Sequence, residues 1–128
     1  MTRLRIEGGL PFIEVTLRYR GKSLRLKNVL VDTGSAGSLF SADRVAEIGI
    51  QLEAHDTLQR IAGVGGSEFV FTKHIESLAL GDMCCENREI EVGAMDYGFP
   101  IEGILGSDFL LAVGALIDMN TLEIRLAV

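Results

Sequence analysis

Apolar and polar residues alternate in the first part of the chain with the period of two that is typical of a β-strand. This alternation runs from Phe12 to Tyr19, where one face of the predicted strand is apolar and the other is polar. Residues 20–23 have the composition of a turn, and Leu24–Val29 continues as the returning strand of a hairpin. Two more apolar residues then lead directly into Asp32. The pattern therefore predicts a hairpin whose second arm ends at an acid.

Short strand-like runs and turns fill the rest of the sequence, and helical periodicity is scarce. Further strands are predicted at Thr57–Ala62, Glu68–Ile75, Ser77–Leu80, Arg88–Val92, Ile101–Leu105, Ala115–Asp118 and Leu122–Leu126. Short helices are predicted at Ala42–Ile48, between the N-cap residue Ser41 and Gly49, and at Ser107–Val113. Crossover helices long enough for a parallel α/β sheet are missing. The chain is therefore assigned to the all-β class.

Composition indicates one folded, acidic domain. With 128 residues, 48% of them hydrophobic, the chain can bury a single core, so residues 1–128 are interpreted as one domain. The net charge of −6 opposes binding to nucleic acid, because phosphate recognition needs a basic surface. No apolar run approaches the roughly 18 residues that span a bilayer, so no membrane partner is expected. No signal peptide opens the sequence.

Residues suited to metal or covalent chemistry are few. Cys84 and Cys85 are adjacent, a spacing that suits neither a disulfide nor a zinc site, and they predict a reducing, cytoplasmic setting. A redox or metal role for the pair is the alternative. His55 and His74, the two histidines, lie in no nucleophile motif and are predicted to lie at the surface. No metal and no cofactor are expected.

The segment LVDTGSAGSLF, Leu30–Phe40, is the strongest candidate for chemistry. An acid beside apolar residues is costly to bury without a partner or a function. The simpler explanation is that Asp32 accepts hydrogen bonds from its own turn, as Asp often does. Further along, Gly63–Gly66 separates two strand-like arms and predicts the tip of a long hairpin, for which an ordinary turn is the simpler explanation. The later GILGSDFLLAVG is a weak echo of the Asp32 segment and suggests an internal pseudo-dyad.

In this order, LVDTGS, GVGG, ILGSDFL and the closing ALIDMNTLEIRL resemble the retropepsin-like aspartic proteases, from about Leu10 to Leu126. The resemblance implies a small closed or orthogonal β-barrel with one or two short helices, active as a two-fold homodimer. It points to a cellular or bacterial branch of the family rather than a viral one. The site residues that it implies are Asp32, Thr33 and Gly34 for catalysis, and Ser35, Ala36, Gly63, Val64, Gly65 and Gly66 for binding a peptide.

Two carboxylates a few Å apart can hydrolyse a peptide bond because they share one proton, so that one acts as base and the other as acid. The sequence supplies one such acid, Asp32, and the second must come from a second copy across a two-fold axis. The predicted function is therefore an aspartic endopeptidase that acts on peptides or unfolded proteins. A catalytically silent module of the same fold, which dimerises or binds peptides, is the alternative. A phosphate-binding DxG loop of actin-like kinases is disfavoured because such kinases need two larger domains.

The resemblance also assigns roles to the neighbours of Asp32. Thr33 would interlock with its symmetry mate, Gly34 would allow a tight turn, and the hydroxyl of Ser35 would bond the catalytic carboxylate. Residues 104–106 would pack beneath the loop.

Three features concern the assembly. Retroviral enzymes have a paired acid and arginine where this chain has Ala36 and Ser107. Asp108 has no obvious partner in the sequence. The terminal segments MTRLRIE and EIRLAV are candidates for a sheet between subunits.

Overall fold

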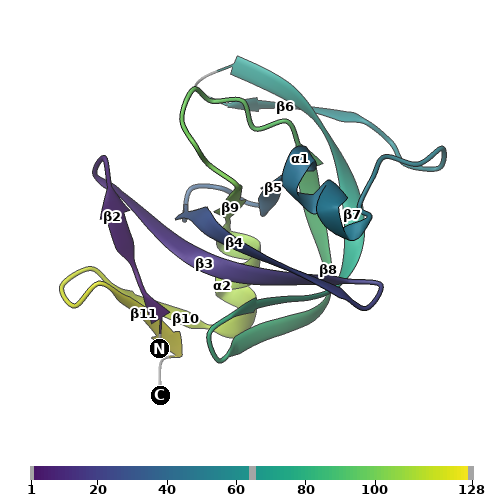
Figure 1. Cartoon of the computed structure of the whole chain (residues 1–128). Coiled ribbons are helices and arrows are strands. Elements are labelled where there is room, and N and C mark those ends of the chain that lie inside the picture. The colour runs from purple at the N-terminus through teal and green to yellow at the C-terminus, as the bar shows by residue number, and fades with distance from the viewer. Residues whose placement is uncertain (1, 64–65, 127–128) are drawn as a thin grey trace.

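The computed structural model describes residues 2–63 and 66–126, and most of them lie in β-strands (Figure 1). The strands are β1 (Thr2–Arg3), β2 (Arg5–Glu7), β3 (Leu10–Tyr19), β4 (Lys22–Val31), β5 (Leu39–Ser41), β6 (Gln59–Gly63), β7 (Gly66–Leu80), β8 (Met83–Gly93), β9 (Gly103–Leu105), β10 (Ala115–Asp118) and β11 (Glu123–Leu126). The helices are α1 (Ala42–Val45), continued by the 3-10 turn η1 (Ala46–Ile48), and α2 (Ser107–Val113).

Six of the strands close into a ring. Their order is β3-β4-β9-β5-β8-β7, and β7 returns to β3, with Leu78 opposite Leu17. Strands β2 and β6 attach to the ring at β3 and β7. The β4–β9 and β5–β8 pairs are parallel, whereas the other pairs are antiparallel. The predicted small, closed β-barrel is thus confirmed, and the two halves of the sequence echo lie side by side as β4 and β9.

Alternation along the ring strands separates two hydrophobic clusters. The larger cluster fills the barrel and contains Ile13, Leu26, Val31, Ile90 and Leu105, each at most 8% exposed. The smaller cluster lies on the opposite face of the strands. It consists of the buried Phe12, Leu39, Val70, Met95 and Ile101, with Leu30, Ile61 and Ile104 packed against them. Leu30, two residues before Asp32, packs against this second cluster.

The two short helices begin and end where the sequence places them. Gly49 ends η1 and Gly114 ends α2, both in the left-handed conformation, with φ of 87° and 65°. Glycine adopts such angles without steric cost, so both helices end at these positions. Ser41 holds the N-cap position of α1, but its side chain makes no capping hydrogen bond. Among the described residues, no helix is long and apolar enough to cross a membrane.

A separate three-stranded sheet is built from the two ends of the chain, in the order β1-β11-β10. Thr2 lies opposite Ile124, and Leu4 N–H donates to Leu122 O at 2.8 Å. Figure 1 shows the two termini next to each other at this sheet. Within the chain β11 is therefore flanked on both sides. In the terminal segments that were candidates for a sheet between subunits, Thr2–Arg3 and Glu123–Ile124 pair with each other within the chain.

Element boundaries are where the sequence prediction was least accurate. Residues Glu68–Ile75 and Ser77–Leu80 were predicted as two strands but form one continuous strand, β7, which starts at Gly66. Strand β9 starts at Gly103 rather than at Ile101. The predictions for α2 and β10 were correct at both ends. The break expected before Ser77 does not occur because β7 continues its ladder with β8 on both sides of that point.

Candidate active site

Asp32 lies where β4 leaves the barrel, and a backbone bond holds it there. Its N–H donates to the carbonyl of Leu105 at 3.0 Å, which extends the parallel β4–β9 ladder by one step. Because side chains alternate along a strand, Asp32 points to the same side as Leu30, toward the smaller hydrophobic cluster. The acid is therefore fixed at the edge of an apolar face.

The carboxylate of Asp32 accepts a hydrogen bond from its own turn. Gly34 N–H donates to Asp32 Oδ1 at 2.9 Å, and Ser35 N–H donates to the Asp32 carbonyl at 3.2 Å. Among residues 2–63 and 66–126, no hydrogen bond joins this carboxylate to a second acid. The turn thus orients one carboxylate and leaves its other oxygen available.

Helix α2 supports the Asp32 loop from below through its first residues. Ser107 N–H donates to Ser35 O at 2.7 Å, and Ser107 Oγ donates to Thr33 O at 2.7 Å. Asp108 N–H donates to Ala36 O at 3.2 Å. The expected packing of residues 104–106 beneath the loop is confirmed by the bond from Asp32 N–H to Leu105 O and by the tight contact of Gly106. A Cβ on Gly106 would lie only 2.2 Å from the Gly37 carbonyl oxygen.

Asp108 has partners, contrary to the sequence-based expectation. Its Oδ1 accepts a 2.7 Å hydrogen bond from Ser38 Oγ, and its Oδ2 accepts one from Ser38 N–H at 3.3 Å. Ser38 Oγ in turn accepts from Gly106 N–H at 3.0 Å. Arg88 Nη2 lies 3.7 Å from Asp108 Oδ2. Asp108 and Ser38 are thus part of the framework of the loop, although neither was a predicted site residue.

Comparison with known proteins agrees with this arrangement. Residues 15–109, about three quarters of the chain, match the family described as aspartyl protease. This chain belongs to the aspartyl protease family. Its fold is similar to the crystal structure of a retropepsin-like aspartic protease from Rickettsia conorii. The TM-score is 0.68 and the sequence identity 20%, over 98% of this chain and 97% of that one. No curated protein matches the chain.

Within this aspartyl protease chain, Ser35 does not have the role that the resemblance implied. Its hydroxyl donates to the carbonyl of Gly37 at 2.8 Å instead of bonding the Asp32 carboxylate. The loop turns back on itself between these residues, so the nearest free acceptor for Ser35 is a backbone carbonyl. The hydroxyl therefore stabilises the loop.

Two positions that differ from retroviral aspartyl proteases, Ala36 and Ser107, each bond a different residue here. Ala36 presents its carbonyl to Asp108 N–H, and the side chain of Ser107 bonds the backbone of Thr33. Neutral hydrogen bonds therefore stand where those enzymes have an ion pair. These bonds link α2 to the Asp32 loop at the two substituted positions, beside the Asp108 carboxylate that bonds Ser38.

The two arms of the predicted hairpin with the Gly63–Gly66 tip are present as β6 and β7. β6 pairs with β7 from Gln59 opposite Val70 to Gly63 opposite Gly66. Val64 and Gly65, which the resemblance implied as substrate-binding, lie outside the described residues. Glu68 in this hairpin accepts a hydrogen bond from the Tyr97 hydroxyl and one from Met95 N–H at 3.3 Å. These bonds connect the hairpin to the loop that follows β8.

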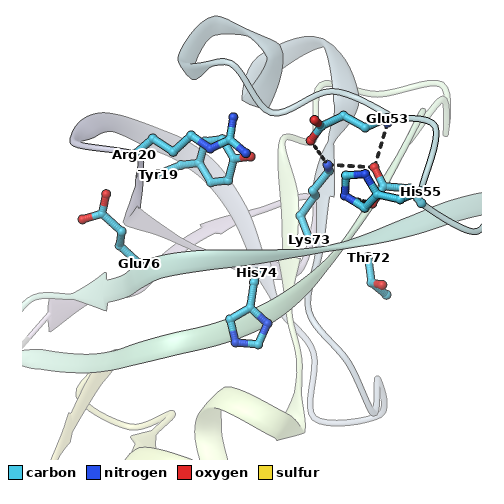
Figure 2. A pocket seen from close by; sticks show the side chains of 9 residues that line it. Tyr19, Arg20, Glu53, His55, Thr72, Lys73, His74 and Glu76 are labelled. Atoms are coloured by element: carbon cyan, nitrogen blue, oxygen red, sulfur yellow. Dashed lines mark hydrogen bonds and ion pairs between the residues drawn. The ribbon is translucent and has the colours of Figure 1, made fainter.

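A second cluster of ionisable residues lies away from Asp32, between β7 and the 51–58 loop (Figure 2). Ligand atoms of Glu53, His55 and Asp56 lie within 4.8 Å of one another, as in a cation site. However, Lys73 Nζ lies 2.5 Å from Glu53 Oε1 and 2.7 Å from Asp56 Oδ2. Lys73 is 7% exposed, and its single ammonium already bonds both carboxylates and occupies the position that a bound cation would take. The cluster anchors the 51–58 loop, and His74 points away from it.

Proposed function

We propose that this chain is an aspartic endopeptidase that acts as a two-fold homodimer. The observation that carries the proposal is the single Asp32 carboxylate, fixed at the edge of an apolar face by Leu105 and by its own turn. One copy supplies half of the pair of acids that the chemistry needs. Membership of the aspartyl protease family and the retropepsin-like fold support the same assignment.

In the proposed mechanism, the two Asp32 carboxylates of the dimer share one proton because like charges at close range cannot both remain ionised. The ionised acid removes a proton from a water molecule, which attacks the peptide carbonyl carbon. The neutral acid donates its proton to the carbonyl oxygen. The resulting tetrahedral intermediate then collapses as the C–N bond breaks and the amine leaves with a proton.

The β6–β7 hairpin is the proposed cover for the bound peptide. Gly63, Val64, Gly65 and Gly66 would bring backbone amides over the substrate and exclude water from the reacting groups. Thr33 and Gly34 would hold the two acids at the two-fold axis. Ser35 and Ala36 would lie beside the bound peptide. We propose a cytoplasmic setting, since both Cys84 and Cys85 are free thiols.

Mixing experiments can test the activity and the dimer together. Wild-type protein should cleave unfolded casein, and Asp32→Asn should fold normally but cleave nothing. If a site is shared between two subunits, activity in freely exchanging mixtures should fall with the square of the wild-type fraction. A linear fall would show that one subunit is sufficient, and casein that is bound but never cut would favour the silent peptide-binding module.

A further inference from the structure

One lateral row of side chains crosses the barrel face that carries Asp32. Leu30 on β4 lies beside Ile104 on β9, Ile104 beside Leu39 on β5, and Leu39 beside Glu91 on β8. Neighbouring strands are about 4.8 Å apart, so three steps place Glu91 about 14 Å from Leu30. The first three members of the row are apolar and pack in the smaller hydrophobic cluster. Glu91 brings a carboxylate to the same face.

Glu91 also lies against the loop of the candidate active site. Its N–H donates to Ser38 O at 2.9 Å, which fixes its backbone next to that loop. A Cβ on Gly37 would lie 2.7 Å from Glu91 Oε1. The missing side chain of Gly37 therefore leaves the space that the carboxylate occupies. The Glu91 carboxylate is therefore next to Gly37, five residues along the loop from Asp32.

The Glu91 carboxylate lacks a counter-charge in this partly buried position. Among the described residues, no hydrogen bond or ion pair reaches it. Burial raises its pKa, and the negative charges of Asp108, Glu89 and Glu68 raise it further. Arg88 on the same strand lies beside Asp108 instead, 3.7 Å from its Oδ2. A cation from outside the chain would offset both the desolvation and the repulsion.

The other acids near Glu91 are already engaged. Glu68 accepts from Tyr97 and from Met95 N–H, and Asp108 accepts from Ser38. Glu89 lies on the same face of β8 as Glu91 but is exposed, opposite His74. Glu91 therefore combines partial burial, free hydrogen-bonding capacity and a place beside the Asp32 loop.

We propose that Glu91 is a specificity-determining residue that receives a lysine or arginine side chain of the peptide substrate. This inference rests on the proposed peptidase function. An extended peptide advances about 3.3 Å per residue, so the span of about 14 Å from Leu30 to Glu91 corresponds to roughly four residues of bound peptide. The length of a lysine or arginine side chain also allows recognition from a position about three residues away. The carboxylate binds either cation through charge-assisted hydrogen bonds.

The test uses pairs of peptides that are identical except that one carries lysine and the other glutamine at a single position. That position is moved, one residue at a time, along both sides of a cleaved bond between two apolar residues. At one position, the wild-type protein should show a kcat/KM about tenfold higher for lysine. Glu91→Gln should abolish this preference, and Glu91→Lys should reverse it in favour of glutamate peptides. Glu89→Gln is the matched control, since it removes the same charge from the same face of β8, and it should keep the preference. Equal loss in Glu89→Gln would overturn the proposal.

Binding to the Asp32→Asn variant separates this inference from the proposed activity. Fluorescence anisotropy with the same peptides should show tighter binding of the lysine peptide, lost on adding Glu91→Gln. Lysine preference in binding without any cleavage by the wild type would refute the peptidase but support the subsite. Cleavage with equal rates for lysine and glutamine at every position would refute the subsite and support the peptidase. No cleavage by the wild type together with no binding of either peptide to Asp32→Asn would overturn both.

Discussion

The Ser38 hydroxyl donates a 2.7 Å hydrogen bond to Asp108 Oδ1 and joins the Asp32 loop to helix α2. The same oxygen accepts from Gly106 N–H, so one buried hydroxyl satisfies groups on both sides of the contact. Ser38 is 1% exposed. Buried polar groups without partners destabilise a fold, and Ser38 removes this problem for two residues at once.

Replacing Ser38 should therefore destabilise the protein. Ser38→Ala leaves Gly106 N–H without its acceptor and deprives Asp108 of its shortest hydrogen bond. The expected loss is about 1–3 kcal/mol in the free energy of unfolding, measured by urea denaturation. Ser23→Ala, at an exposed position of β4, is the control and should change stability by less than about 0.5 kcal/mol. Equal losses in the two variants would contradict this account.

Gly106 should tolerate no side chain. In Gly106→Ala, the new Cβ meets backbone atoms, the carbonyl oxygens of Gly37 at 2.2 Å and Ser35 at 2.7 Å. We expect a loss of about 3 kcal/mol or more, or no folded protein. In Gly37→Ala, the closest obstacle is the end of the Glu91 side chain, which can turn away. The melting temperature of Gly37→Ala should therefore be well above that of Gly106→Ala. The reverse order would show that the loop around Gly106 can shift to accommodate a side chain.

Lys73 should control the acid stability of the protein. Its hydrogen bonds lower the pKa of Glu53 and of Asp56 from their ordinary values of 4.5 and 3.8. A carboxyl whose pKa is lower in the folded state stabilises the fold at pH values above its ordinary pKa. This stabilisation is lost as the pH falls through the folded-state pKa. In Lys73→Met, the unfolding free energy should decline less steeply as the pH falls below 4.5. Lys22→Met, at an exposed position, should keep the wild-type slope in urea denaturation at each pH.

Glu91 should have the opposite pH dependence. Burial and then the charge of Asp108 raise its pKa above the ordinary value of 4.5, so the folded state binds this proton more tightly than the unfolded chain. Folding stability attributable to Glu91 is therefore lost as the pH rises from 4.5 through the folded-state pKa. Glu91→Gln should match the wild type at pH 4 and exceed it at pH 7 in thermal melting. A Glu91→Gln protein less stable than the wild type at pH 7 would refute this.

Patterns within a strand or a helix could be read from the sequence, and they predicted the all-β class and most of the elements. The alternation from Phe12 to Tyr19, the glycines that end the helices and the glycine-rich hairpin tip each depend on neighbouring residues. Figure 1 shows the corresponding elements at the expected places in the chain. The barrel, by contrast, came from the resemblance to a family, because local patterns do not determine which strands pair.

The framework of the candidate site was not visible in the sequence because its partners are far apart along the chain. Ser38 and Asp108 are 70 residues apart, and no local pattern links a serine in a loop to an acid in a later helix. The same holds for Gly37 and Glu91, which meet only because β5 and β8 pair in parallel. Ser35 shows the opposite error, since its assigned contact came from relatives while the local turn offered a closer acceptor.

The bond from Asp32 N–H to Leu105 O has a consequence for the order of events during synthesis. A ribosome releases the Asp32 segment long before it releases Leu105 and the helix that follows. Until then Asp32 has no β9 strand to hold it, so a chain that ends before Leu105 leaves this carboxylate without its backbone support. Under the proposed peptidase function, cleavage therefore requires a chain synthesised at least through Leu105 and α2.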